Sequence, residues 1–247
     1  MVPSDLSTGA WGLLATSALF IGMAKTGLPG VGSLAIVLMA LVIPARQSTG
    51  LILPMLIVGD LFAVSYYSRH AVWSHLWRLL PFALPGIVAG YWGMHHLPER
   101  YFAPLIGGTI LVMLVLGFWQ NRGGGQKAPP GGWLFPAAMG LLGGVTTMMA
   151  NAAGPILVIY LLAMRLPKTE FIGTGAWFFL MVNLIKVPFS ADLGLINPLS
   201  LKLNLLLAPL ILLGAFLGIR LVRWIPEKVF NLLVQLFAAI AAVKLLF

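Results

Sequence analysis

The sequence contains no cysteine and few acidic residues. Without cysteine the chain has no disulfides, no thiol catalysis and no cysteine-ligated metal. Asp and Glu together number 6 in 247 residues, and charged residues of both signs make up 9% of the chain. Soluble proteins carry roughly 25% charged residues. The composition therefore argues against a soluble fold, and it leaves little carboxylate for an enzyme that acts on lipid.

Hydrophobic residues, in contrast, make up 60% of the chain, and its mean hydropathy is +0.99. Uncharged runs at residues 26–45, 79–98 and 101–121 each have about the 20 residues of one membrane-spanning helix. The run 128–164 is too long for one span and must turn inside the membrane or at its surface. These runs predict an all-α integral membrane protein in contact with lipid.

The net charge of +9 comes from basic residues at the ends of these runs, a distribution typical of membrane anchoring and not of nucleic-acid binding. If the segments alternate across the membrane, nine Lys and Arg residues fall on one side and five on the other. The richer side is expected in the cytoplasm. This count predicts a multi-pass protein of the inner (cytoplasmic) membrane with both termini outward.

We expect about ten helical segments, five in each half of the chain. They are residues 9–24, 33–43, 49–67, 76–95 and 102–119, then 133–149, 154–164, 171–189, 201–221 and 229–247. The linker 120–132 is rich in Gly, Pro and charge, and it separates a first membrane repeat (1–119) from a second (133–247).

A pattern that occurs twice supports this division. The pattern P-x-x-L-x-G-x-x-x-G-x7-P-E-x-x-F is met by Pro81, Leu84, Gly86, Gly90, Pro98, Glu99 and Phe102, and again by Pro209, Leu212, Gly214, Gly218, Pro226, Glu227 and Phe230. Its identical spacing indicates an internal duplication. An odd number of segments in each copy would insert the two copies upside-down relative to one another, as inverted repeats.

The second segment of each copy is short. Residues 33–43 would form about 16 Å of helix, half of a hydrocarbon core of about 30 Å. Gly and Pro interrupt the chain just before it, at 25–32 and again at 146–155. Open backbone is tolerated in a membrane only where protein buries it or a cavity exposes it. We expect two broken helices, re-entrant or spanning, that meet near the midplane as in secondary transporters.

The first break carries a candidate anion site. Lys25 supplies a positive charge, Thr26 a hydroxyl, and glycines let the backbone approach a ligand. These glycines are Gly27, Gly30 and Gly32. The alternative is that Lys25 lies at the membrane surface and the glycines only permit tight helix packing.

The second break, with Asn151, Ala152 and Gly154, has no charge but offers neutral hydrogen-bond donors, including Thr146 and Thr147. A site built from both breaks suits a small oxyanion better than a cation or a sugar, and we expect no cofactor or metal.

Two more charged residues fall inside apolar segments, where charge is costly and usually functional. A shift of 123 positions aligns Asp60 with Asn183, and Lys186 follows one helical turn later. Asp60 and Lys186 are predicted to approach one another, either as a pair that lines the pathway and couples or gates it, or as a static lock between the copies. Lys186 could instead snorkel to the interface. Trp177 either lines the cavity or packs in the core.

Several motifs together carry a family resemblance. They are Ala24-Lys25-Thr26-Gly27-Leu28-Pro29-Gly30, Ser48-Thr49-Gly50 through Leu53-Pro54 to Gly59-Asp60, Asn151-Ala152-Ala153-Gly154-Pro155 and Gly173-Thr174-Gly175-Ala176-Trp177. Over nearly its whole length the chain resembles the sulfite exporter TauE/SafE family, also called the toluene-sulfonate uptake permease family. The resemblance implies a transporter of sulfur oxyanions or organosulfonates that works without ATP. Many members have a run of glycines in both loops, whereas this chain has Asn151 and Ala152 in the second loop, which changes the available donors.

These observations predict a secondary transporter of a small anion by alternating access, and not an enzyme. An anion channel that uses the same residues is the alternative. A proton or sodium ion is the expected coupling ion, and the protein is expected to be a monomer or homodimer.

Overall fold

The chain is helical, as its composition predicts. The computed structural model describes residues 7–28, 31–40, 42–43, 45–96, 98, 100 and 132–226, and six isolated positions at 229, 232, 233, 236, 240 and 243. No strand occurs among these residues. The all-α class is therefore confirmed for the part of the chain that the structure describes.

Eight of the ten expected segments correspond to α-helices. In the first half these are α1 (Thr8–Thr26), α2 (Val31–Ala40), α3 (Ala45–Tyr67) and α4 (Trp73–His96), with a short 3-10 helix η2 (Ser68–His70) between the last two. In the second half they are α6 (Leu134–Ala150), α7 (Gly154–Ala163), α8 (Lys168–Asp192) and α9 (Pro198–Trp224). The expected segment 102–119 and most of 229–247 lie outside the described residues, so the layout of ten helices in two repeats stays a prediction.

Three of the described helices are long and apolar enough to cross a membrane, namely Gln47–His70, Lys168–Asp192 and Pro198–Trp224. Large apolar side chains also cover their outer surface: Leu205 of α9 is 78% exposed and Trp224 is 87% exposed. A helix that is apolar on its outer as well as its inner face is suited to a hydrocarbon surrounding.

The two short helices follow two helix breaks. α6 ends at Asn151, which adopts a left-handed backbone (φ 53°), and Pro155 stands in the first turn of α7. α1 ends before Gly27, whose N–H donates to the Met23 carbonyl. α2 and α7 have 10 residues each, which at 1.5 Å per residue covers about half of a bilayer core.

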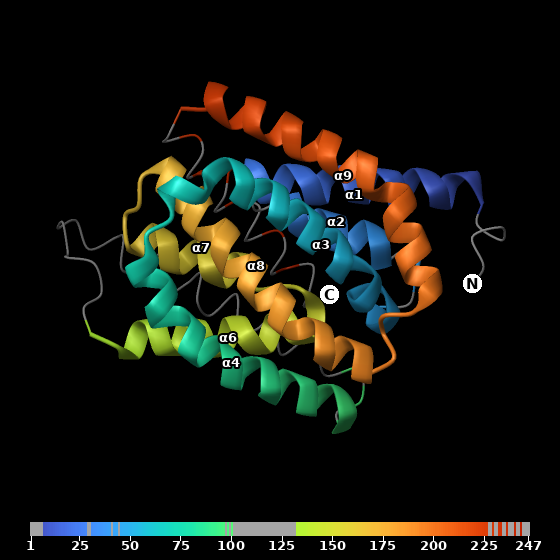
Figure 1. Ribbon diagram of the computed structural model, residues 1–247, viewed down its shortest axis with the longest axis horizontal. Coiled ribbons are helices and arrows are strands. Elements are labelled where there is room, and N and C mark those ends of the chain that lie inside the picture. The colour runs from blue at the N-terminus through green and yellow to red at the C-terminus, as the bar shows by residue number, and fades with distance from the viewer. Residues whose placement is uncertain are drawn as a thin grey trace.

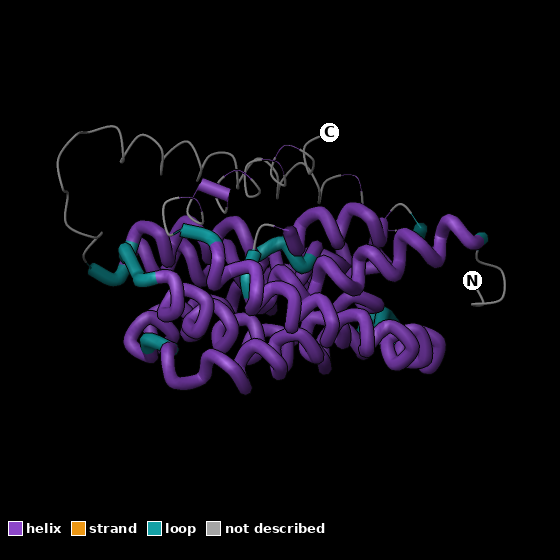
Figure 2. Tube along the Cα trace, turned by 90° about the horizontal axis from the view of Figure 1, so that it is seen from above, coloured by secondary structure: helices purple, strands orange, loops and turns teal. Residues whose placement is uncertain are grey.

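Each half of the chain packs its first helix against the fourth helix of the other half. The most extensive contacts are those of α4 with α6 and of α1 with α9. In Figure 1, α1 and α9 lie along one edge of the molecule and α4 and α6 along the opposite edge, with α3 and α8 between them. Figure 2 shows the same helices from above, most of them running along the long axis.

Glycines make these two helix pairs close, and they do so in the same way. A Cβ added to Gly86 of α4 would overlap the carbonyl oxygen of Leu141 in α6. A Cβ added to Gly214 of α9 would overlap the carbonyl oxygen of Leu19 in α1. Gly86 and Gly214 occupy the same position of the duplicated pattern, so both copies use that glycine to seat a neighbouring helix.

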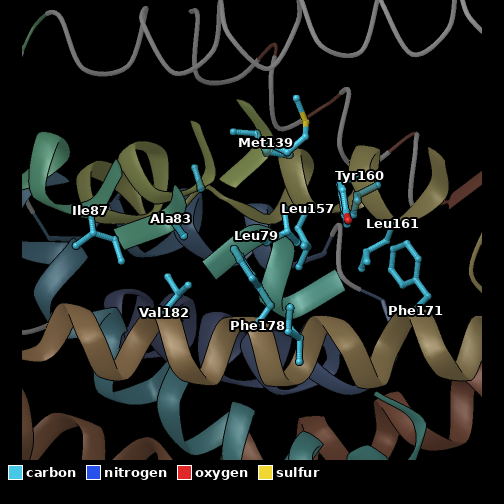
Figure 3. Close-up of a cluster of buried hydrophobic side chains, with 14 of the residues drawn as sticks. Leu79, Ala83, Ile87, Met139, Leu157, Tyr160, Leu161, Phe171, Phe178 and Val182 are labelled. Atoms are coloured by element: carbon cyan, nitrogen blue, oxygen red, sulfur yellow. The ribbon is translucent and has the colours of Figure 1, made fainter. Parts of the chain in front are cut away.

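A small apolar cluster lies between α3 and α8, and two larger clusters fill the rest of the described interior. One is formed mainly by α4, α6, α7 and α8, and Figure 3 labels Leu79, Met139, Tyr160 and Phe178, one side chain of the cluster from each of these helices. The other is formed by α1, α2, α3 and α9. The polar residues described next join α1 and α3 to α6 and α8, and so lie where elements of the two clusters meet.

Candidate functional site

Three charged side chains are buried in the part of the chain that the structure describes. The Lys25 side chain is 8% exposed, that of Asp60 is 0% exposed, and Lys186 is 1% exposed. Removing an ion from water costs several kcal/mol even after the protein relaxes. The neighbours of each group therefore decide whether that group is structural or available to a ligand.

Lys25 and Asp60 form an ion pair. Lys25 Nζ lies 2.8 Å from Asp60 Oδ1 and 4.3 Å from the centroid of the Phe179 ring, a distance at which the ring face attracts a cation. Lys25 also stands in the last turn of α1, where the helix dipole favours positive charge. The charge of Lys25 is thus balanced within the protein.

Among the described residues, Lys186 has no such counter-charge in contact. Its Nζ donates to Asn151 Oδ1 at 2.5 Å, to Thr147 Oγ1 at 3.1 Å and to Asn183 Oδ1 at 3.3 Å. An ammonium group has three N–H donors, and all three meet oxygens of neutral side chains. The hydrogen-bonding capacity of Lys186 is satisfied while its charge is not balanced.

Hydrogen bonds from the amide nitrogens of two asparagines fix the orientation of the oxygens around Lys186. Asn183 Nδ2 donates to Asp60 Oδ2 at 2.7 Å, and Asn151 Nδ2 donates to the Thr49 carbonyl oxygen at 2.9 Å. A carboxylate and a carbonyl accept only, so each amide must turn its nitrogen toward them. Both amide oxygens consequently face Lys186.

These contacts form one polar chain from α1 to α6. It runs from Lys25 to Asp60 in α3, to Asn183 and Lys186 in α8, and on to Asn151 at the end of α6. The ends of the two broken helices, which are more than 100 residues apart in sequence, are therefore connected across α3 and α8.

The first helix break contributes fewer side chains to this series of polar contacts than the sequence suggests. The Thr26 hydroxyl donates to the Ala215 carbonyl at 2.7 Å, and a Cβ on Gly27 would overlap the backbone of Gly218 in α9. Gly32 lies in the first turn of α2 against Ala24. These contacts match the helix-packing interpretation of Thr26 and Gly27, and their contact with a ligand stays a prediction. Gly30 lies outside the described residues.

The second break lies directly beside Lys186. Asn151 bonds to it, Ala152 is buried with its N–H donating to the Thr146 carbonyl, and Gly154 begins α7. A Cβ added to Gly154 would meet no atom within 4 Å. Space is therefore open beside the first turn of α7.

The remaining expectations need adjustment in three respects. Asp60 pairs directly with Lys25 and reaches Lys186 only through Asn183. Lys186 is buried, which removes the snorkelling alternative. Trp177 packs on Trp73 with 5.1 Å between ring centroids, and its buried indole N–H has no hydrogen-bond partner among the residues that the structure describes.

Sequence reasoning missed two contributors to the chain. Phe179 lies beneath Lys25, and the Thr49 carbonyl anchors Asn151. Phe179 carries no local signal, because one phenylalanine among many is not distinguished by its type. Thr49 follows Ser48 at the start of an expected helix, but a backbone carbonyl leaves no trace in sequence.

No group of three or more His, Cys, Asp or Glu side chains that could hold a metal occurs among the described residues. Comparison with known proteins adds one finding. The profile of a family described as Sulfite exporter TauE/SafE matches residues 14–245, nearly the entire chain. No curated protein and no solved structure matches it.

Proposed function

We propose that the chain, which belongs to the sulfite exporter TauE/SafE family, is a secondary transporter that carries a small anion across the cytoplasmic membrane. The anion is a sulfur oxyanion or an organosulfonate, and it crosses by alternating access. Family membership and the candidate membrane-spanning helices make the chain a multi-pass membrane protein of a transporter family. The identity of the anion and the mode of transport are our proposal.

The observation that carries the proposal is the buried ammonium of Lys186. It is 1% exposed and contacts only neutral oxygens in the described chain. Such a group is costly in the resting protein and is stabilised when an anion binds. A transporter needs a site of this kind, because the substrate must exchange its hydration shell for contacts inside the membrane.

The anion would bind between Lys186 and the second break. Asn151 and Thr147 supply polar contacts, and the open space beside Gly154 leads to the first turn of α7. The first N–H groups of a helix have no partner within the helix and attract negative charge. One full charge, an amide, a hydroxyl and a helix N-terminus together suit a tetrahedral oxyanion.

Helix contacts in one half of the chain recur in the other half, as expected of two inverted repeats that move against one another. Gly90 approaches the Val145 carbonyl and Gly218 approaches the Met23 carbonyl. Val145 lies 122 positions after Met23, and Leu141 lies 122 positions after Leu19. Likewise the two pattern glycines of the second half each lie 128 positions after the corresponding glycine of the first half. A twofold relation between inverted repeats would give all residues of two equivalent helices the same sequence offset.

Asp60 and Asn183 are hydrogen-bonded to each other and are themselves 123 positions apart. Equivalent residues of two copies meet in this way at a twofold axis. We therefore propose that the polar chain lies at the axis about which the repeats rock. Asp60 is the residue that would take the coupling ion, because binding of a proton or sodium ion there competes with Lys25.

Uptake into proteoliposomes tests this proposal. Purified protein should accumulate labelled sulfite or methanesulfonate, uptake should saturate, and an excess of unlabelled substrate inside should accelerate entry of the label. Accelerated counterflow requires a carrier that alternates, whereas a channel would show none. Absence of saturable uptake for every sulfur oxyanion and sulfonate would refute the proposal.

A further inference from the structure

We propose that the central site is built for a single negative charge, so that it takes a monovalent oxyanion such as an alkanesulfonate in preference to a divalent one such as sulfate. This inference rests on the proposed function and narrows its substrate class. It follows from counting the charges that the protein buries together.

Lys25, Asp60 and Lys186 are joined in one hydrogen-bonded chain through Asn183. While all three groups are ionised and no coupling ion occupies Asp60, two ammonium groups and one carboxylate leave a surplus of one positive charge (2 − 1 = 1). Thr147, Asn151 and Asn183 are neutral. All other charged side chains of described burial are partly or fully exposed, where solvent or lipid headgroups weaken their effect on the interior.

A bound monoanion would bring this cluster to neutrality. A dianion would reverse its sign and leave one uncompensated negative charge among buried groups. A surplus buried charge of either sign is unfavourable, and the interior screens it poorly. The same geometry therefore favours one charge state of the ligand whatever its shape.

The location of the surplus strengthens the argument. Asp60 contacts Lys25 directly and is separated from Lys186 by the Asn183 amide. The positive charge that has no counter-charge in contact among the described residues is thus Lys186, which bonds to Asn151 of the second break. An arriving anion meets that charge and not the Lys25–Asp60 pair.

Methanesulfonate and sulfate make a matched pair of probes, since both are tetrahedral about sulfur and differ in having a methyl group or a second charged oxygen. We would measure the affinity of the detergent-purified full chain for each anion by ligand-induced thermal stabilisation. The wild type should bind methanesulfonate at least about tenfold more tightly than sulfate, a difference of about 1.4 kcal/mol.

Variants that change the charge but hardly the shape separate this mechanism from a difference in hydration. Asp60→Asn raises the surplus to two and should shift the preference toward sulfate by at least about tenfold. Asn183→Asp removes the surplus and should weaken methanesulfonate binding by at least about tenfold. The double variant Lys25→Met/Asp60→Asn returns the surplus to one, and the wild-type preference ratio should return with it.

The outcomes are distinguishable. A preference that stays constant across all variants would reflect hydration of the anions and would overturn the charge inference. Sulfate binding as tight as methanesulfonate binding in the wild type would overturn it as well, while the transport proposal would stand. If neither anion nor sulfite binds or crosses the membrane, the proposed function itself fails. The double variant contains no unpaired buried charge besides Lys186, so it provides a reading even if a single variant does not fold.

Discussion

Lys25→Met and Lys186→Met are chemically the same substitution at two buried lysines, yet we expect different consequences. Removing Lys25 leaves Asp60 buried with one amide donor, Asn183 Nδ2, as its remaining partner. Breaking a buried ion pair from one side costs about 3–5 kcal/mol of folding free energy. Lys25→Met should therefore be strongly destabilising.

Lys186→Met removes a charge that has no counter-charge in contact within the described part of the chain. The protein loses three hydrogen bonds to neutral oxygens, each worth about 1.5–3 kcal/mol when one partner is charged. It also no longer bears the cost of burying an unpaired ion, which is several kcal/mol. These contributions oppose one another, so the free energy of unfolding should change much less than in Lys25→Met.

Anion binding should be weakened by both variants, because each removes the surplus positive charge, but more by Lys186→Met, which also removes the group that contacts the ligand. The ligand would take the place of one of the three oxygens at Lys186 Nζ, and loss of that charge-assisted hydrogen bond, about 1.5–3 kcal/mol, corresponds to about 10- to 150-fold weaker binding. The affinity of Lys186→Met for methanesulfonate should fall by this factor, and methanesulfonate should then no longer raise the unfolding temperature of the variant.

The assay is thermal unfolding of the purified protein with and without methanesulfonate, for the two single variants and for Lys25→Met/Asp60→Asn. The double variant should recover much of the stability lost in Lys25→Met, because the unpaired carboxylate is gone. Equal destabilisation by the two lysine variants would refute the reasoning. So would wild-type methanesulfonate affinity in Lys186→Met.

Three further predictions concern the packing and the helix breaks. Gly214→Ala places a Cβ against the Leu19 carbonyl and should cost about 1–3 kcal/mol in unfolding experiments, whereas Gly12→Ala, at an exposed helical position with no atom within 4 Å, should leave stability unchanged or slightly raised. Asn151→Ala should be about 1–2 kcal/mol less stable than Asn151→Gly by the same measurement, because the backbone there is left-handed; equal stabilities would contradict this. Tyr67→Phe removes a 3.1 Å hydrogen bond to the carbonyl that ends α1 and should cost about 1 kcal/mol, and unaltered unfolding would show that this contact is not needed.

The sequence predicts the described helices well because their determinants are local. Apolar length, the glycine and proline interruptions at the two breaks, and the basic segment ends are all properties of contiguous residues. The duplicated pattern goes further: Gly86 and Gly214 must be small because each receives a neighbouring backbone, and a repeated steric requirement leaves a repeated residue.

Which buried charges contact one another could not be predicted from local sequence in the same way. Sequence identifies Lys25, Asp60 and Lys186 as unusual, because ionisable residues inside apolar segments are costly. It does not tell which lysine meets the carboxylate, since that choice depends on where α1 and α8 cross α3. Lys25 thus carried the expected anion site, although its charge is balanced by Asp60 and the unbalanced charge is that of Lys186.

The constant sequence offsets between the two halves allow their residues to be compared position by position around the buried charges. Asp60 in one half corresponds to Asn183 in the other, 123 positions later, and the same shift relates Ala63 to Lys186. Thr147 lies 122 positions after Lys25, the shift that relates the helices carrying them. Had both halves kept Lys25 and Asp60, the interior would hold two ion pairs and no net charge. Because the second half has threonine and asparagine there and adds Lys186, similar backbones enclose one surplus positive charge. Similar helix packing in both halves suits the proposed reciprocal movement, whereas the unequal side chains would create the proposed attraction for an anion, so the two properties should be altered independently by substitution.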